Sequence, residues 1–205
     1  MAEAIDITAL AAHLSALPPG RRLVAVAGPP AAGKSTVTEN LAARITTRGR
    51  RAQVVPMDGF HLSNSDLDDL GLRTRKGAPE TFDVPGLLAL MTALRSGSPV
   101  AFPTFDRAVD ATVPDGGIFD ADIAIVEGNY LLLDEDPWRG LLPLWDTTVM
   151  LDVPEDVLRD RLVARWVAHG MTTQAGLARA EANDLPNARR VQTGSVAADH
   201  VLRTA

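Results

Sequence analysis

The chain has 205 residues, of which 46% are hydrophobic and 22% charged. These values suit one globular domain with enough apolar material for a core, and they exclude an intrinsically disordered chain. Cysteine is absent, which excludes disulfides, zinc–thiolate sites and thiol catalysis. The net charge is −6 and no dense run of Lys and Arg occurs, so we expect no nucleic-acid partner.

Targeting signals are not apparent in the sequence. No apolar run approaches the roughly 18 residues of a membrane-spanning helix. Glu3 and Asp6 stand where a secretory signal carries basic residues. We therefore expect a soluble, cytoplasmic protein without a membrane partner.

Of the 20 basic residues only Lys34 and Lys76 are lysines, which favours sites that need a compact point charge, unless this distribution is accidental.

The first half of the chain alternates helical and extended patterns. Apolar residues at helical spacing predict a helix over 7–17, before a Pro-Pro-Gly turn. Short apolar runs predict strands over 22–27 and 52–57, with a helix over 34–48 between them. The polar stretch 60–82 is predicted to be a long loop that includes a short helix, and loops of that length are usually functional.

The second half continues the alternation. Asp83 is a predicted N-cap for a helix through residue 96, and residues 99–113 are predicted to form a small hairpin. The remaining predicted elements are strands over 123–126 and 147–153, a helix over 154–168 opened by a proline, and a closing strand over 200–202. Residues 169–195 are polar and poorly periodic, so no element is predicted there.

Strands that alternate with helices predict an α/β fold, with a parallel sheet covered on both faces. Ligands of such sheets bind beyond the carboxyl ends of the strands. The first three predicted strands end at Gly28, Asp58 and Glu127. A glycine-rich turn and two carboxylates are therefore expected at one edge of the sheet.

Residues 28–35 fit the pattern G-x-x-x-x-G-K-[ST] in full, between a predicted strand and a predicted helix. In such a loop the backbone N–H groups and the helix N-terminus converge on phosphate oxygens. Lys34 would reach the β- and γ-phosphates, and Ser35 would supply a hydroxyl to Mg²⁺. The alternative is an ordinary strand-to-helix turn. We predict a nucleoside triphosphate site formed by Gly28, Ala31, Ala32, Gly33, Lys34, Ser35 and Thr36.

The strand-end carboxylates are candidates for catalysis. Asp58 could accept the proton of an acceptor hydroxyl or orient it, and Glu127 would join Ser35 at the metal. Each has an alternative interpretation as a turn residue before glycine. The guanine-binding motif N-K-x-D is absent, which argues against a small GTPase.

Arg161 and Arg165 lie four residues apart on one face of a predicted helix. Leaning over the phosphates, they would stabilise the charge of the transition state. A solvated helix face is the alternative.

Together these residues resemble the phosphoribulokinase/uridine kinase family of P-loop kinases, which includes bacterial type I pantothenate kinase. The segments that carry the resemblance are Asp58-Gly59-Phe60, residues 75–83 (RKGAPETFD), residues 103–106 (PTFD), residues 125–128 (IVEG) and residues 153–156 (VPED). The resemblance implies a three-layer P-loop fold with a five-stranded parallel sheet. It also implies one domain over 1–205, with an acceptor-side insertion at about 59–118 and a lid at about 161–195.

The family's activity implies ATP, Mg²⁺ and a small-molecule hydroxyl acceptor. The resemblance implies Lys34, Asp58, Arg165 and Arg161 as catalytic residues. It places the acceptor among Asp58, Arg75, Lys76, Phe82, Asp83 and Phe105, and we also expect Tyr130 there and His61, which could hydrogen-bond an acceptor hydroxyl. For Asp83 an N-cap role is the alternative, and for Arg75 and Lys76 a solvated loop.

His61 and the pair Asn129-Tyr130 depart from the pantothenate kinase pattern. The segments MDGFHLSN and VEGNYLLLD are more similar to a bacterial subgroup labelled as kinases of a fructose transport system. We therefore expect a kinase that phosphorylates a hydroxyl of a small polar metabolite, with a sugar as one candidate. A nucleoside or pantothenate kinase is the first alternative, and a nucleotide-gated switch or assembly ATPase is the second. The oligomeric state stays open, with a homodimer as one option.

Overall fold

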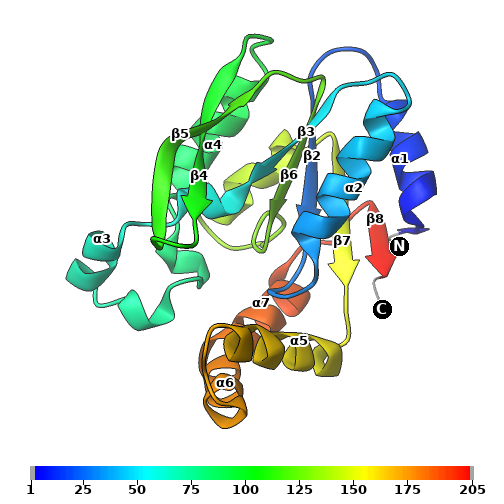
Figure 1. Ribbon diagram of the computed structural model, residues 1–205. Helices are drawn as coiled ribbons and strands as arrows, with labels where there is room; N and C mark the ends of the chain where they lie inside the picture. The colour runs from blue at the N-terminus through cyan, green and yellow to red at the C-terminus, as the bar shows by residue number, and fades with distance from the viewer. Residues whose placement is uncertain (1–2, 204–205) are drawn as a thin grey trace.

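The computed structural model describes residues 3–203, so both ends of the predicted domain, 1 and 205, lie outside the described residues. Its main sheet is parallel, with the strand order β1-β8-β7-β2-β6-β3 (Figure 1). The strands are β1 (Glu3–Ala4), β2 (Arg22–Ala27), β3 (Ala52–Pro56), β6 (Ile123–Gly128), β7 (Thr147–Asp152) and β8 (His200–Arg203). The predicted α/β fold with five parallel strands is confirmed, and the two-residue β1 extends it at one edge.

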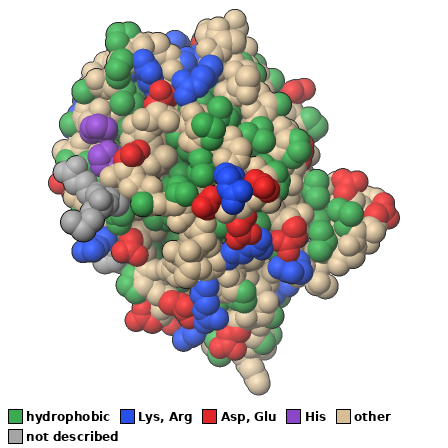
Figure 2. All heavy atoms as spheres, turned by 180° about the vertical axis from the view of Figure 1, so that it is seen from behind, with side chains coloured by type: hydrophobic (Ala, Val, Ile, Leu, Met, Phe, Trp, Pro, Cys, Tyr) green, Lys and Arg blue, Asp and Glu red, His purple; other side chains and the backbone are tan. Residues whose placement is uncertain are grey.

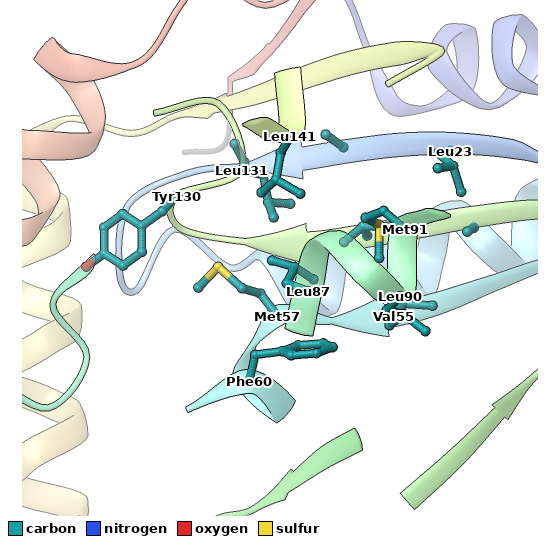
Figure 3. Packing of buried hydrophobic residues seen from close by; sticks show 14 of the residues in the cluster. Leu23, Val55, Met57, Phe60, Leu87, Leu90, Met91, Tyr130, Leu131 and Leu141 are labelled. Carbon is teal, nitrogen blue, oxygen red and sulfur yellow. The ribbon is translucent and has the colours of Figure 1, made fainter. Parts of the chain in front are cut away.

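Helices cover both faces of this sheet because the central strands are apolar on both sides. Along β2, Val24 and Val26 belong to a core cluster with α1 (Ile7–Ser15) and α2 (Lys34–Thr46). Leu23 and Ala25 point the other way, into a cluster with α4 (Val84–Leu94). Figure 3 shows residues of this second cluster packed between α4 and the strands. The alternation predicted from the sequence therefore produces three layers.

A two-stranded antiparallel sheet, β4 (Val100–Asp106) and β5 (Ala111–Phe119), projects beside the main sheet (Figure 1). The predicted hairpin ended at residue 113, six residues too early. The sequence pattern failed there because Gly116 and Gly117 carry no side chains. A Cβ atom on Gly117 would lie 2.4 Å from the ring of Phe102, so glycine lets this ring pack against the strand.

The segment between β3 and α4 is mostly irregular, as predicted. It contains a 3₁₀ turn (Met57–Phe60), the short helix α3 (Asn64–Asp69) and two further 3₁₀ turns (Arg73–Arg75 and Pro79–Thr81). Asp83 caps α4, since its carboxylate accepts a hydrogen bond from the Gly86 N–H at 3.0 Å.

The C-terminal part is more helical than predicted. After α5 (Glu155–Ala168) come α6 (Thr173–Arg179), a π-helical turn (Ala180–Asp184) and α7 (Leu185–Gly194). The expectation that 169–195 contains no element was wrong, because half of the positions in these helices are polar and the apolar signal is sparse. In α7 it consists of the buried residues Leu185, Ala188 and Val191.

The α5–α7 segment lies beyond the carboxyl ends of the central strands (Figure 1). Within residues 3–203, no helix combines the length and the apolar character that crossing a membrane requires. Seen from behind the view of Figure 1, the surface carries acidic, basic and apolar side chains that are interspersed (Figure 2).

Candidate active site

The sheet register brings the predicted strand-end residues together. β6 pairs with both β2 and β3, so that Gly128 lies beside Ala27 and Glu127 lies beside Pro56. The phosphate loop follows β2 directly, and Asp58 follows β3 by two residues. The parallel register therefore brings these groups together at one edge of the sheet, as predicted.

The phosphate loop has the backbone of an anion-binding turn. Gly33 has φ +88° and Ala31 has φ +64°, both in the left-handed region. Gly33 is the N-cap of α2 and has no side chain to accept from the first N–H groups of the helix. Gly28 is required for close packing, since a Cβ there would lie 2.9 Å from the Leu151 Cβ. The first N–H groups of α2 and the positive end of this helix are therefore suited to binding a phosphate.

Lys34 is the cation of this loop, and it is part-buried. Its Nζ donates to Gly28 O and Pro29 O, each at 3.0 Å, and to Asn129 Oδ1 at 2.6 Å. Burial lowers the Lys34 pKa, and the carboxylates of Glu127 and Asp58 oppose that shift. Asn129 was not predicted as a site residue. The sequence marked it only as a departure from the family pattern.

Ser35 and Glu127 form the candidate metal position. Ser35 Oγ donates to Glu127 Oε1 at 3.0 Å. Burial raises the Glu127 pKa, whereas Lys34 acts against that shift. In the described part of the chain no group of three or more His, Asp or Glu side chains could hold a metal. Two adjacent oxygen donors without a protein cage fit Mg²⁺, which keeps waters and phosphate oxygens as its other ligands.

A cavity of about 540 Å³ opens in front of these groups. Of the predicted phosphate-loop residues, Ala31, Gly33, Lys34, Ser35 and Thr36 line it, whereas Gly28 and Ala32 do not. The other predicted residues in its wall are Asp58, His61, Lys76, Phe82, Phe105, Glu127 and Arg165. The cavity therefore joins the predicted nucleotide side to most of the predicted acceptor side.

Asp58 lies in the wall of the cavity next to a residue that the sequence analysis missed. Its Oδ2 accepts a hydrogen bond from Arg107 Nη2 at 2.8 Å. Arg107 directly follows the 103–106 segment of the resemblance, which was the available signal for it. The pair places a cation beside the candidate base.

Aromatic rings and an ion pair form the rest of the acceptor wall. The His61 ring stacks on Phe82 at 4.1 Å and lies 4.9 Å from Phe105. Burial lowers the His61 pKa to about 4, so the imidazole is neutral at pH 7. Lys76 Nζ lies 4.9 Å from the Phe105 ring and pairs with Asp110 at 2.8 Å. The wall therefore offers both apolar faces and charged groups.

Three predicted acceptor residues do not line the cavity. Arg75 pairs with Glu80 at 2.7 Å. Asp83 caps α4, which is the alternative already considered for it. Tyr130 is fully buried and donates its hydroxyl to Gly77 O at 2.6 Å.

The α5–α7 segment supplies the remaining wall. Arg165 lines the cavity, whereas Arg161 reaches the phosphate loop through a hydrogen bond to Ala31 O at 3.4 Å. Four other residues of this segment line the cavity and were not predicted, namely Trp166, Arg179, Asp184 and Asn187. All but Trp166 lie in the part for which no element was predicted.

Hydrogen bonds join this segment to the acceptor side. Arg179 Nη1 donates to Thr74 O at 3.3 Å, and Asn183 Nδ2 donates to Lys76 O at 3.2 Å. The segment over 161–195 therefore contacts both the nucleotide loop and the loop that carries Lys76, as a lid would.

The comparisons with known proteins agree with this geometry. The phosphoribulokinase/uridine kinase family matches residues 23–184. A crystal structure from a Silicibacter species, provisionally described as a fructose transport system kinase, superimposes with a TM-score of 0.92 and 43% identity. The match covers 98% of this chain and all of that one.

Two curated relatives match most of the chain. The Escherichia coli protein YggC is 38% identical over 195 residues, which is 94% of this chain and 82% of that protein. A Schizosaccharomyces pombe protein provisionally named a uridine kinase is 33% identical over 195 residues, 89% of this chain and 83% of that protein. With the nucleotide loop, strand-end carboxylates and cavity described above, these matches show that the chain belongs to the phosphoribulokinase/uridine kinase family and is a small-molecule kinase that phosphorylates a hydroxyl group.

Proposed function

We propose that this kinase uses Mg²⁺ and ATP to phosphorylate a hydroxyl of a small polar metabolite, with a sugar as the first candidate. The observation that carries the proposal is the shared cavity. Lys34, Glu127 and the carboxylate of Asp58 open onto one space of about 540 Å³, large enough for a triphosphate end and a small acceptor.

The proposed reaction needs positioning more than covalent chemistry. Asp58 accepts the proton of the acceptor hydroxyl, whose oxygen then bonds to the γ-phosphorus. The bond from that phosphorus to the β,γ-bridging oxygen breaks, and ADP leaves. Lys34 and Arg165 stabilise the negative charge on the phosphoryl oxygens.

Ser35 and Glu127 are proposed to hold Mg²⁺, which would neutralise phosphate charge when bound. Arg161 is proposed to support the loop through Ala31 O, one step away from the reacting atoms. We therefore assign the phosphate contact to Arg165, which is exposed and lines the cavity.

The acceptor wall favours a compact polar molecule. His61 is neutral at pH 7 and its Nδ1 is buried without a hydrogen-bond partner among residues 3–203. The rings of Phe82 and Phe105 offer apolar faces of the kind that bind the C–H side of a sugar or a nucleobase. Lys76 and Arg107 add cations near the acceptor.

The test is a panel of sugars, nucleosides and vitamins that include pantothenate, assayed for ADP formation with Mg²⁺ and ATP. One chemical class should raise ADP formation far above the background hydrolysis. The same compound should raise the melting temperature with a nonhydrolysable ATP analogue present. ADP release that only a protein partner accelerates would instead support the switch or assembly ATPase.

A further inference from the structure

The acceptor side of the cavity carries more positive than negative side chains. The cations in this part of its wall are Arg73, Lys76 and Arg107, and the carboxylates are Asp58 and Asp110. An acceptor that enters displaces water from these groups, and a charge that loses water costs free energy unless an opposite charge takes its place. The surplus cation therefore favours an acceptor with a negative group.

Arg107 is the ionic partner of the candidate base. Its Nη2 donates to Asp58 Oδ2 at 2.8 Å, and its other N–H groups have no hydrogen-bond partner within residues 3–203. In the proposed reaction Asp58 becomes neutral when it accepts the hydroxyl proton, so Arg107 then lacks an ionic partner. A guanidinium binds carboxylate or phosphate oxygens through two parallel N–H groups. An anionic group on the acceptor would supply the missing partner.

Lys76 lies in the same wall, and little of its side chain is exposed. Its Nζ donates to Asn64 Oδ1 and Asp110 Oδ1, each at 2.8 Å, and to Asp110 O at 3.2 Å. The Asp110 side chain is half exposed, and an ion pair with so exposed a partner contributes little free energy. Water can replace Lys76 at the Asp110 carboxylate, so an anionic group of the acceptor can take the place of that carboxylate on the ammonium.

The turn between β4 and β5 brings the two cations together. Arg107 belongs to this turn, and Asp110, the partner of Lys76, follows it by three residues. Figure 1 shows this turn beside α3, and Asn64 of α3 donates to Asp110 Oδ2 at 3.0 Å. The only other lysine of the chain, Lys34, is the cation of the phosphate loop. Lys76 is therefore the second position at which the sequence uses a compact point charge.

We propose that the acceptor carries an anionic group, a carboxylate or a phosphate, in addition to the hydroxyl that is phosphorylated, and that Lys76 and Arg107 bind this group. Arg73, whose ion pair with Asp68 is exposed, adds a third cation to the wall. This step rests on the proposed function, and it narrows the first candidate from sugars in general to sugar acids and sugar phosphates.

Matched sets of compounds test the proposal. Glycerol, ribose and glucose are each compared with the corresponding acid (glycerate, ribonate and gluconate) and with the terminal phosphate ester. For the alternative acceptors, pantothenate is compared with panthenol and uridine with its monophosphate. ADP formation with Mg²⁺ and ATP gives kcat/KM for each compound. In at least one set an anionic member should exceed its neutral member by about tenfold or more, the gain expected for a hydrogen bond between charged groups. The acid and ester arms show which anion is bound.

Lys76→Met removes the charge and keeps an unbranched side chain. The ratio of kcat/KM for the anionic member to that for the neutral member should fall about tenfold in this variant. Lys76→Arg keeps the charge and should keep the ratio within about threefold of the unmodified protein. A merely structural role of Lys76 in holding the β4–β5 turn would lower both values alike, and an unchanged ratio in Lys76→Met would overturn the inference.

Two further variants act as controls. Arg75→Met is the matched control, because Arg75 precedes Lys76, pairs with Glu80 and does not line the cavity, so that the ratio should stay unchanged. Asp110→Asn keeps an oxygen for Lys76 but removes the competing charge, and it should lower the KM for the anionic member by up to about fivefold. A rise of that KM would show that the Asp110 charge helps the acceptor to bind, and would overturn the inference.

The outcomes separate this inference from the proposed function. Neutral members that are phosphorylated as well as the anionic ones would overturn the inference and leave the kinase reaction in place. Where no compound is phosphorylated, calorimetry on the protein loaded with a nonhydrolysable ATP analogue decides. Binding of anionic members that Lys76→Met abolishes would support the inference and count against the proposed reaction. Absence of both turnover and binding would overturn both.

Discussion

The two sides of the cavity are built differently. The phosphate side comes mainly from one continuous segment, 28–36, whose lysine is part-buried and saturated with hydrogen bonds. The acceptor side comes from distant segments and is held by partly exposed ion pairs. Arg107 is 68% exposed beside Asp58, and Asp110 is 52% exposed beside Lys76.

This difference separates chemistry from selectivity. Exposed ion pairs exchange partners at little cost, so a bound acceptor can displace them. The groups at the strand ends are set by sheet register and cannot move without disturbing the core. Substitutions on the phosphate side should therefore abolish turnover, whereas many on the acceptor side should change only which molecule is accepted.

The largest effect is expected for Lys34→Ala. Removing this cation takes away the charge that stabilises the transferred phosphoryl group, and turnover should fall about 10³-fold. ADP formation by the purified variant measures this, with circular dichroism to establish that it is folded. Near-normal turnover would show that the phosphate side has been assigned to the wrong loop.

Asp58→Asn should lower kcat by at least about 10²-fold, because an amide cannot accept the hydroxyl proton. Asp83→Asn is the matched control, because it makes the same carboxylate-to-amide change at a residue that does not line the cavity. Asp83 caps α4 away from the cavity, and asparagine is also a good N-cap, so its kcat should be unchanged. Equal losses in the two variants would contradict the role of Asp58 as a base.

The His61 side chain should make stability depend on pH. Its pKa in the folded protein is about 4, below the ordinary value of 6.5, because burial disfavours the charged ring. Between these values the unfolded chain binds more protons, so the free energy of unfolding should fall as pH drops from 6.5 to 4, by up to about 3 kcal/mol. Urea unfolding of His61→Gln should lack this component. The exposed His13, changed to Gln, serves as the control, and an unchanged pH profile in His61→Gln would contradict the prediction.

The smallest effect is expected for Arg75→Ala. Arg75 is half exposed, pairs with Glu80 and does not line the cavity. Its loss should cost less than about 1 kcal/mol of stability and leave the KM for the acceptor within about twofold. Lys76→Ala, one residue on, should raise that KM by more. A larger KM change in Arg75→Ala would show that residues 73–82 rearrange when the acceptor binds.

Sequence patterns predicted most of the sheet and the edge at which the candidate site lies. The apolar runs of β2, β3, β6 and β7, and the residues at which they end, are local features of the chain. In a parallel sheet the strand ends meet at one edge, so the meeting of Asp58 and Glu127 follows from their positions at strand ends. The P-loop is local as well, since one octapeptide contains its turn, lysine and hydroxyl.

The partners of these groups could not be predicted in the same way. Lys34 and Asn129 are 95 residues apart, and Asp58 and Arg107 are 49 apart, so only the packed chain brings them together. Tyr130 illustrates the point, since its sequence position leaves open which way its ring turns, and in the structure the ring is buried in the core and its hydroxyl donates to Gly77 O.

The sequence by itself thus determined the layered fold, the phosphate loop and the two strand-end carboxylates, because hydrophobic periodicity and turn chemistry act over a few residues. Only the tertiary structure decided the helices over 173–194, the acceptor wall and the hydrogen bonds of Asn129 and Tyr130. Those depend on which distant surfaces pack against each other, and the direction of a side chain is settled by that packing.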